Sequence, residues 1–122
     1  MGQTMATAGP EDSYPTVWVV WLVIGLLGPV TEEFTSRGLE WVAAESLARS
    51  SWLPLILTSV LFVLPHHPSS IGIAAGYGVF AVMMGALRLR TGGVVVPIIA
   101  HVTCNLTILL TVWGYSVWLS AR

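Results

Sequence analysis

Hydrophobic residues fill most of this chain in five runs, separated by short polar or turn-forming stretches. Lipid leaves backbone polar groups without partners, and the runs lack the alternation of barrel strands, so each run is predicted to be helical. A helix needs roughly 20 apolar residues to cross a bilayer. The last run meets that length, whereas the first has only 12 residues. The predicted segments are 16–27, 30–49, 52–66, 71–90 and 94–119.

Turn-forming residues set the limits of these segments. Gly28 and Pro29 are expected to break or kink the chain between the first two. The prolines of "PHHPSS" close the third segment, and "RTGG" ends the fourth. The fourth segment is rich in small residues, which predicts close packing against a neighbouring helix in lipid.

The composition agrees with a membrane protein. Apolar residues make up 55% of the chain and charged residues only 9%, whereas a soluble domain has about 25% charged residues. The expected fold is an all-α integral membrane helical bundle, with a four-helix core and a short or kinked extra helix at the N-terminus. Residues 1–15 are predicted to be a disordered polar tail, and residues 16–122 one transmembrane domain.

The formal net charge of −1 and the dispersed arginines exclude a nucleic-acid partner, and a single cysteine excludes an intrachain disulfide. The membrane orientation depends on the first two segments. If they cross separately, Arg49, Arg88 and Arg90 share one side, which the positive-inside rule makes cytoplasmic. If they form one kinked element, that relation changes.

The stretch "GPVTEEFTSRG" concentrates charge inside this apolar sequence. An ionisable group at membrane depth costs at least about 2.5–3.5 kcal/mol, so such groups pair or face a polar cavity. Glu33 and Arg37 are four residues apart on one helical face and could neutralise each other. Glu32 is not satisfied by that pair. A structural ion pair and a functional site are both open at this point.

Other polar residues in apolar surroundings favour a functional site. Phe62 and His66 lie four residues apart in the third segment, as do His101 and Asn105 in the fifth. A lone buried histidine is more often a hydrogen-bonded core residue than a catalyst. Here a carboxylate, two histidines and an amide arise on three segments of one small bundle, and they are expected to converge on one polar cavity.

Three motifs carry a resemblance to a known family. "EEFTSRG" matches EExxxR followed by glycine, "FVLPH" matches FxxxH, and "HVTCN" matches HxxxN. In this order they resemble the CAAX protease and bacteriocin-processing (CPBP, or Abi) family of intramembrane proteases, over roughly residues 17–110. Thr35 and Ser36 depart from the usual apolar residues, and His67 follows His66 directly. Full members usually carry further helices ahead of this core, so the chain is expected to be a minimal member or a fragment.

The resemblance implies hydrolysis of a peptide bond in a membrane-associated protein, with prenylated CAAX proteins as one substrate class. It implies that Glu32 is the general base and that His66 helps to activate water, while His101 and Asn105 stabilise the oxyanion. Glu33, Arg37 and Phe62 are then supporting residues. This preferred mechanism requires no cofactor. Zn²⁺ held by Glu32, His66 and His101 remains an alternative, since the family has been described both ways.

A different class of function stays open beside the protease. The same polar cluster could belong to a non-catalytic membrane protein, such as a bacteriocin-immunity protein or a proton-carrying subunit. The expected partners are the lipid bilayer and a membrane-associated peptide or protein substrate, and the sequence leaves oligomerisation open. The expected location is the plasma membrane of a prokaryote.

Overall fold

The structure, a computed structural model, describes residues 14–47, 50 and 52–122, and in these residues every regular element is helical. This confirms the predicted all-α membrane bundle. The predicted tail falls largely outside the described residues, although Tyr14 already belongs to a helix. The elements are α1 Tyr14–Val20, η2 Trp21–Leu27, α2 Gly28–Glu33, η3 Phe34–Glu40, α3 Trp41–Leu47, α4 Trp52–Val63, η4 Leu64–His66, α5 Ile71–Thr91 and α6 Val95–Ser120.

Three helices are long and apolar enough to cross a membrane. They are Val17–Leu47, Ile71–Thr91 and Val95–Ser120, while the apolar helix Trp52–His66 is shorter. Most of their large apolar side chains are exposed, as expected for surfaces that face lipid. The chain is therefore an integral membrane protein.

Gly28 and Pro29 do not break the helix, so of the two alternatives left open by the sequence the structure has the one in which the first two segments form a single element. The five elements from α1 to α3 follow one another without a gap and form one long helix. A π-helical turn, η2, ends just before Gly28, whose N–H donates to the Val23 carbonyl five residues back. Pro29, which has no N–H to donate, is the second residue of α2 and follows this turn directly. The wider turn thus accommodates the proline inside a continuous helix.

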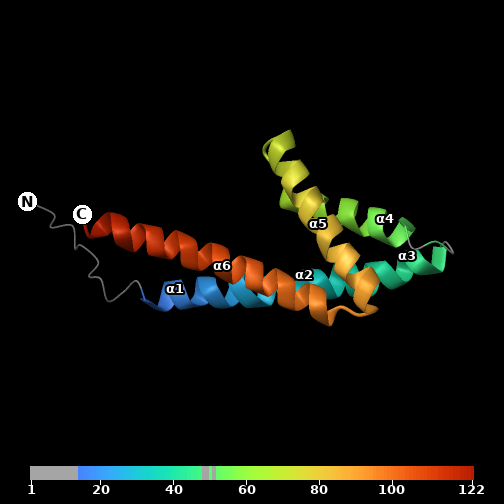
Figure 1. Cartoon of the computed structure of the whole chain (residues 1–122), viewed down its shortest axis with the longest axis horizontal. Helices are drawn as coiled ribbons and strands as arrows, with labels where there is room; N and C mark the ends of the chain where they lie inside the picture. Colours follow the sequence, from blue (N-terminus) through green and yellow to red (C-terminus); the bar gives the residue numbers. More distant parts are fainter. Residues whose placement is uncertain (1–13, 48–49, 51) are drawn as a thin grey trace, which may run out of the picture.

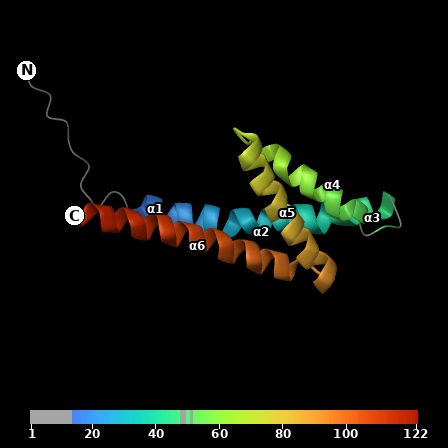
Figure 2. The ribbon, with the colours of Figure 1, turned by 45° about the horizontal axis from the view of Figure 1, so that its top comes forward.

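Two other helices accompany this long helix on different parts of its length. α6 runs back along η2 and α2, whereas α4 and α5 pack together near α3 (Figure 1). The rotated view keeps α6 beside the first half of the long helix (Figure 2). Trp21 and Trp113 meet edge to face between these two helices, with ring centroids 6.5 Å apart. The helix bearing Glu32 and Glu33 therefore contacts α4, α5 and α6 through its successive elements.

Two glycines allow the helices to approach closely. A Cβ atom on Gly85 would collide with Leu55 of α4 and would lie 3.5 Å from the Trp41 ring. A Cβ on Gly25 would lie 2.7 Å from Leu106 of α6. By contrast, Gly76 in the same α5 helix meets nothing within 4 Å. The small residues of α5 thus permit close packing at Gly85, but not along its whole length.

The two π-helical turns leave backbone carbonyls that accept hydrogen bonds from other helices. The Ile24 carbonyl in η2 has lost its usual partners, because the Gly28 N–H bonds to Val23 and Pro29 has no N–H. The Asn105 amide of α6 donates to it at 2.9 Å.

The second π-helical turn, η3, also leaves a carbonyl free. The Trp41 N–H donates to the Ser36 and Gly38 carbonyls and not to the Arg37 carbonyl. Arg88 Nε of α5 donates to the Arg37 carbonyl at 3.0 Å. Both turns therefore tie the long helix to its neighbours.

Candidate active site

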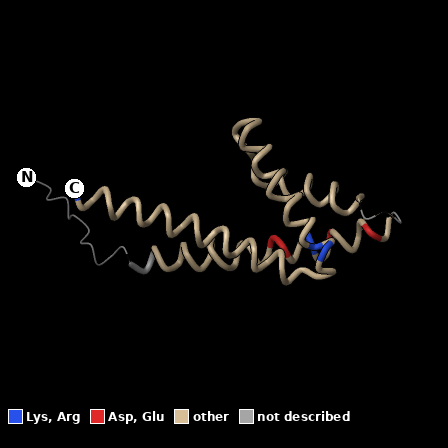
Figure 3. The backbone as a smooth tube through the Cα atoms, viewed as in Figure 1, with Lys and Arg blue, Asp and Glu red and all other residues tan. Residues whose placement is uncertain are grey.

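Apart from Arg122 at the C-terminus, the charged residues of the described part gather along the second half of the long helix and near the end of α5 that lies beside it (Figure 3). Glu32 lies near the middle of the long helix, which over Val17–Leu47 is apolar and long enough to cross a membrane. A helix that crosses the bilayer symmetrically would hold this carboxylate near the middle of the membrane. An ionisable group at that depth marks a candidate functional site.

Glu32 lies between two histidines from different helices. Its Oε2 atom is 3.9 Å from His66 Nε2 and 3.9 Å from His101 Nε2. His66 ends the short turn η4 after α4, and His101 lies in the first half of α6. The three side chains that the sequence motifs single out thus converge, although they are far apart in the chain. Polar atoms at this separation can share one bridging water.

Hydrogen bonds on the far side of each imidazole orient the ring. His66 Nδ1 lies 2.7 Å from the Phe62 carbonyl, which can only accept, so Nδ1 carries the hydrogen. His101 Nδ1 lies 2.9 Å from Glu33 Oε1 and donates to that carboxylate when it is ionised. Both rings therefore use Nδ1 to fix their orientation, and both point Nε2 towards Glu32.

Glu33 joins two parts of the site. Its fully buried carboxylate bonds His101 through Oε1, and its Oε2 lies 3.3 Å from Arg37 Nε. That second separation is close enough for an ion pair, but the two atoms lack hydrogen-bond alignment. The Glu33–Arg37 pair expected from the sequence is therefore present. The sequence does not predict the hydrogen bond between Glu33 and His101, because this bond depends on how α6 packs against α2.

Arg37 is completely buried and is held from three sides. Its Nη2 donates to the Ala81 carbonyl of α5 at 2.6 Å, and its guanidinium lies 4.9 Å from the centre of the Phe62 ring. Glu33 provides the opposite charge. Arg37 thus links the long helix to α4 and α5 behind the histidines.

Asn105 does not join the cluster directly. Its side-chain nitrogen donates to the Ile24 carbonyl, one turn before Pro29, and its side chain is only partly buried. An amide has two N–H groups, so one remains for another acceptor. Three of the four predicted catalytic residues therefore meet at one point, while the fourth is anchored to the same long helix nearer to its N-terminus.

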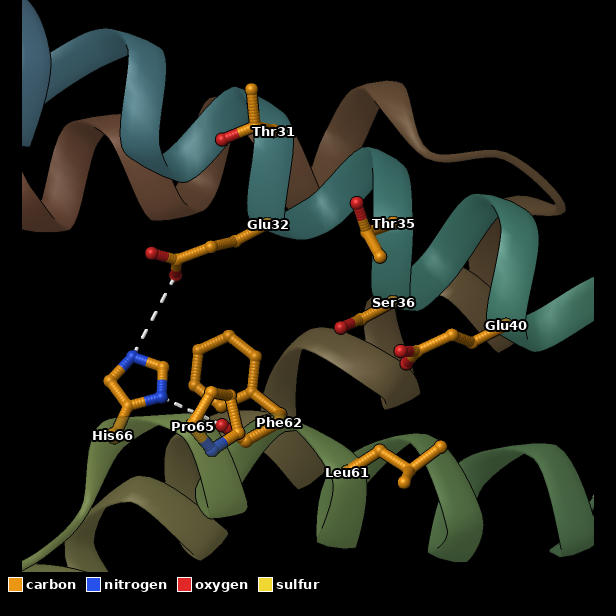
Figure 4. Close-up of a pocket in the computed structure, with 9 residues that line it drawn as sticks. All are labelled: Thr31, Glu32, Thr35, Ser36, Glu40, Leu61, Phe62, Pro65 and His66. Carbon is orange, nitrogen blue, oxygen red and sulfur yellow. Dashed lines mark hydrogen bonds and ion pairs between the residues drawn. The ribbon is translucent and has the colours of Figure 1, made fainter.

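A cavity of about 210 Å³ opens beside Glu32. One wall comes from the long helix and is polar, and the other comes from the end of α4 and is mainly apolar (Figure 4). The side chains of Glu32 and His66 point towards each other across it. The lining residues are Thr31, Glu32, Thr35, Ser36, Glu40, Leu61, Phe62, Pro65 and His66. The expectation that all four predicted catalytic residues face one cavity is therefore wrong for His101 and Asn105, which do not line it.

The structure adds residues that the motifs did not indicate. Tyr77 of α5 lies against His66, with ring centroids 4.6 Å apart, and Phe80 lies 4.6 Å from His101. Tyr77 and Phe80 are three residues apart and therefore lie on one face of α5, and this spacing is the sequence pattern that could have indicated them. His67 is exposed and has a positive φ of 42°, so it is His66 that faces the cavity.

The donor atoms suit zinc chemically but are spread too widely for a formed site. Ligands at roughly 2.0–2.1 Å in a tetrahedron lie about 3.3 Å from one another, whereas the two Nε2 atoms are each 3.9 Å from Glu32 Oε2. Within the described ranges, no group of three or more His, Cys, Asp or Glu side chains is arranged to hold a metal ion. Zinc binding would require these side chains to close by about half an ångström.

Comparison with known proteins gives one family and one relative. A family described as "Type II CAAX prenyl endopeptidase Rce1-like" matches residues 14–107. An "Uncharacterized 24.3 kDa protein" of Escherichia coli is 29% identical over 93 residues, which cover 75% of this chain and 43% of that protein. The chain therefore spans less than half the length of this relative. No solved structure matches significantly.

Proposed function

The chain belongs to the Rce1-like family of type II CAAX prenyl endopeptidases, and we propose on this premise that it hydrolyses a peptide bond of a membrane-associated, CAAX-type protein. The observation that supports this most directly is the convergence of Glu32, His66 and His101, of which Glu32 and His66 line a cavity. Amide hydrolysis needs an activated water and a donor for the oxyanion, and these side chains supply both kinds of group.

In the proposed mechanism, a water molecule lies between Glu32 Oε2 and His66 Nε2, which are 3.9 Å apart. His66 Nε2 accepts one hydrogen of this water, because Nδ1 already donates to the Phe62 carbonyl. Glu32 accepts the other hydrogen and takes the proton as the oxygen attacks the scissile carbonyl. The proton then passes to the leaving amine. Glu32 thus acts first as a base and then as an acid.

His101 is proposed to stabilise the oxyanion. To donate through Nε2 while Nδ1 donates to Glu33, the ring must carry both protons. A positive His101 together with Arg37 balances the negative charges of Glu32 and Glu33, so the cluster as a whole is neutral. The second N–H of Asn105 is the other proposed donor, with the Ile24 carbonyl holding the amide in place. This mechanism requires no metal.

Zinc remains the second candidate, and one observation favours it. Metal-bound histidines usually donate their other ring N–H to a carboxylate or a carbonyl, and Glu33 and the Phe62 carbonyl are in those positions. If zinc binds, Glu32, His66 and His101 would hold it, and it would supply a polarised water. Glu33 and Phe62 would then fix the orientation of the ligands.

The direct test is cleavage of a farnesylated peptide that ends in Cys-aliphatic-aliphatic-X, by the purified chain in lipid nanodiscs. We expect turnover by the wild-type protein and a loss of at least about 100-fold in Glu32→Gln, in keeping with the loss of a general base. Glu32 is partly exposed to the cavity, so the variant should still assemble. Absence of cleavage by the wild-type protein would overturn the proposal and favour a binding or proton-carrying role. We also propose that the protein lies in the plasma membrane of a prokaryote.

A further inference from the structure

The cavity beside Glu32 contains a second carboxylate that the proposed reaction does not use. Glu40 lies eight residues after Glu32 on the same side of the long helix, and both side chains line the cavity. Figure 4 shows the Glu40 carboxylate directed towards the space between the helix and Leu61. Glu40 is thus at the opposite end of the cavity from Glu32 and His66.

One oxygen of the Glu40 carboxylate has no hydrogen-bond partner. This atom, Oε2, is buried. No arginine or histidine nitrogen of the described residues lies within ion-pair distance of it. Arg37 attracts Glu40 electrostatically, but its guanidinium contacts Glu33, the Ala81 carbonyl and the Phe62 ring and forms no ion pair with Glu40. A buried carboxylate oxygen without a partner is costly, so a ligand that supplies a cationic donor would stabilise it.

The rest of the cavity also favours a cation. Its polar wall presents two carboxylates and the hydroxyls of Thr31, Thr35 and Ser36, and its other wall is mainly apolar. No lysine or arginine lines it. We propose that Glu40 is a specificity-determining residue, which binds a lysine or arginine side chain of the substrate. This inference rests on the proposed peptidase function.

The length of the helix gives the position of that side chain in the substrate. Eight residues of α-helix rise about 12 Å, and the wider π-helical η3, which holds Phe34–Glu40, makes this an upper limit. An extended peptide advances about 3.3 Å per residue. The basic residue is therefore at most three to four residues from the scissile bond. A CAAX-type substrate ends in a carboxylate three residues beyond that bond, and Glu40 would repel this anion. The basic residue is accordingly on the amino-terminal side of the bond.

The test compares farnesylated peptides that carry Lys, Gln or Glu at one position at a time on the amino-terminal side. We expect Lys at the third or fourth position to raise kcat/KM by about 10-fold over Gln, as for one charge-assisted hydrogen bond. Glu40→Gln should remove this preference, and Glu40→Lys should reverse it in favour of Glu. Glu45→Gln is the matched control, because Glu45 is exposed and bonds to Trp41 Nε1 away from the cavity.

Two results would overturn the proposal. One is a wild-type enzyme that cleaves the Lys and Gln peptides equally well. The other is an equal loss on all peptides in Glu40→Gln, which would make Glu40 a structural neighbour of Arg37. Binding of the same peptides is measured by fluorescence anisotropy, independently of turnover. Preferential binding of Lys peptides that depends on Glu40, without any cleavage, would support the Glu40 site while the peptidase proposal fails.

Discussion

Glu33 accepts a hydrogen bond from His101 at 2.9 Å, while its other oxygen lies 3.3 Å from Arg37. One buried carboxylate therefore connects the histidine beside Glu32 to the arginine that holds the helices together. The two consecutive glutamates of the EExxxR motif consequently have different environments. Glu32 is exposed to the cavity, whereas Glu33 is fully buried behind it.

Replacement of Glu33 should affect both stability and activity. Glu33→Gln leaves Arg37 without its buried counter-charge, and loss of one partner of such a pair costs about 3–5 kcal/mol. The variant should also lose turnover, because His101 is no longer oriented by a carboxylate. Thermal unfolding and peptide cleavage would be measured on the same nanodisc preparation. Wild-type melting temperature and turnover would contradict the role of Glu33 in linking His101 to Arg37.

The doubled histidines provide a matched pair of variants. His66→Asn should reduce kcat by about 100-fold or more, since it removes the Nε2 atom that faces Glu32. His67→Asn should retain near wild-type turnover, because His67 is exposed and asparagine tolerates its positive φ of 42°. Single-turnover cleavage rates check the pair. Equal losses in both variants would show that catalysis requires the conformation of the turn after α4 and not the His66 side chain itself.

Asn105 has a structural bond and a proposed catalytic one, and these can be separated by magnitude. Loss of the hydrogen bond to the Ile24 carbonyl should cost about 0.6 kcal/mol of stability, a typical value between membrane helices. Loss of an oxyanion donor should reduce kcat by about 100- to 1,000-fold. We expect Asn105→Ala to show both effects. A small loss of stability with an unchanged kcat would restrict Asn105 to its bond with η2.

Metal removal distinguishes the two proposed mechanisms. Under the preferred one, activity survives dialysis against a chelator, because Glu32 and His66 activate water without a metal. Under the zinc alternative, chelation abolishes turnover and about one zinc or cobalt ion per chain restores it. Metal content by mass spectrometry accompanies the assay. Full chelator sensitivity together with stoichiometric metal would reject the preferred mechanism.

Close packing at Gly85 predicts a position-dependent effect of larger residues on α5. Gly85→Val should destabilise the bundle by about 1–3 kcal/mol, because the new side chain collides with Leu55. Gly76→Val in the same helix is the control, since no atom lies within 4 Å of a Cβ there. Melting temperatures in detergent compare the two. Similar losses in both variants would indicate a helix-propensity effect instead of packing.

The sequence by itself determined the kind of fold and most of the helix limits. An apolar composition with few charges requires helices in lipid, and runs bounded by proline and glycine placed the segments 52–66, 71–90 and 94–119 within a residue or so of the observed helices. It also indicated Glu32, His66 and His101, because polar side chains are rare and costly in such a chain. These conclusions depend on composition and local spacing, which a sequence displays directly.

Only the tertiary structure decided how these residues meet. Pro29 is a helix breaker by local rules, yet the π-helical turn before it and the Asn105 amide from α6 satisfy the backbone around it. The bond of Glu33 to His101 depends on the packing of α6 against α2, which no spacing within the motif encodes. Long-range contacts of this kind are fixed by which helix faces approach each other, and local sequence patterns do not specify that approach.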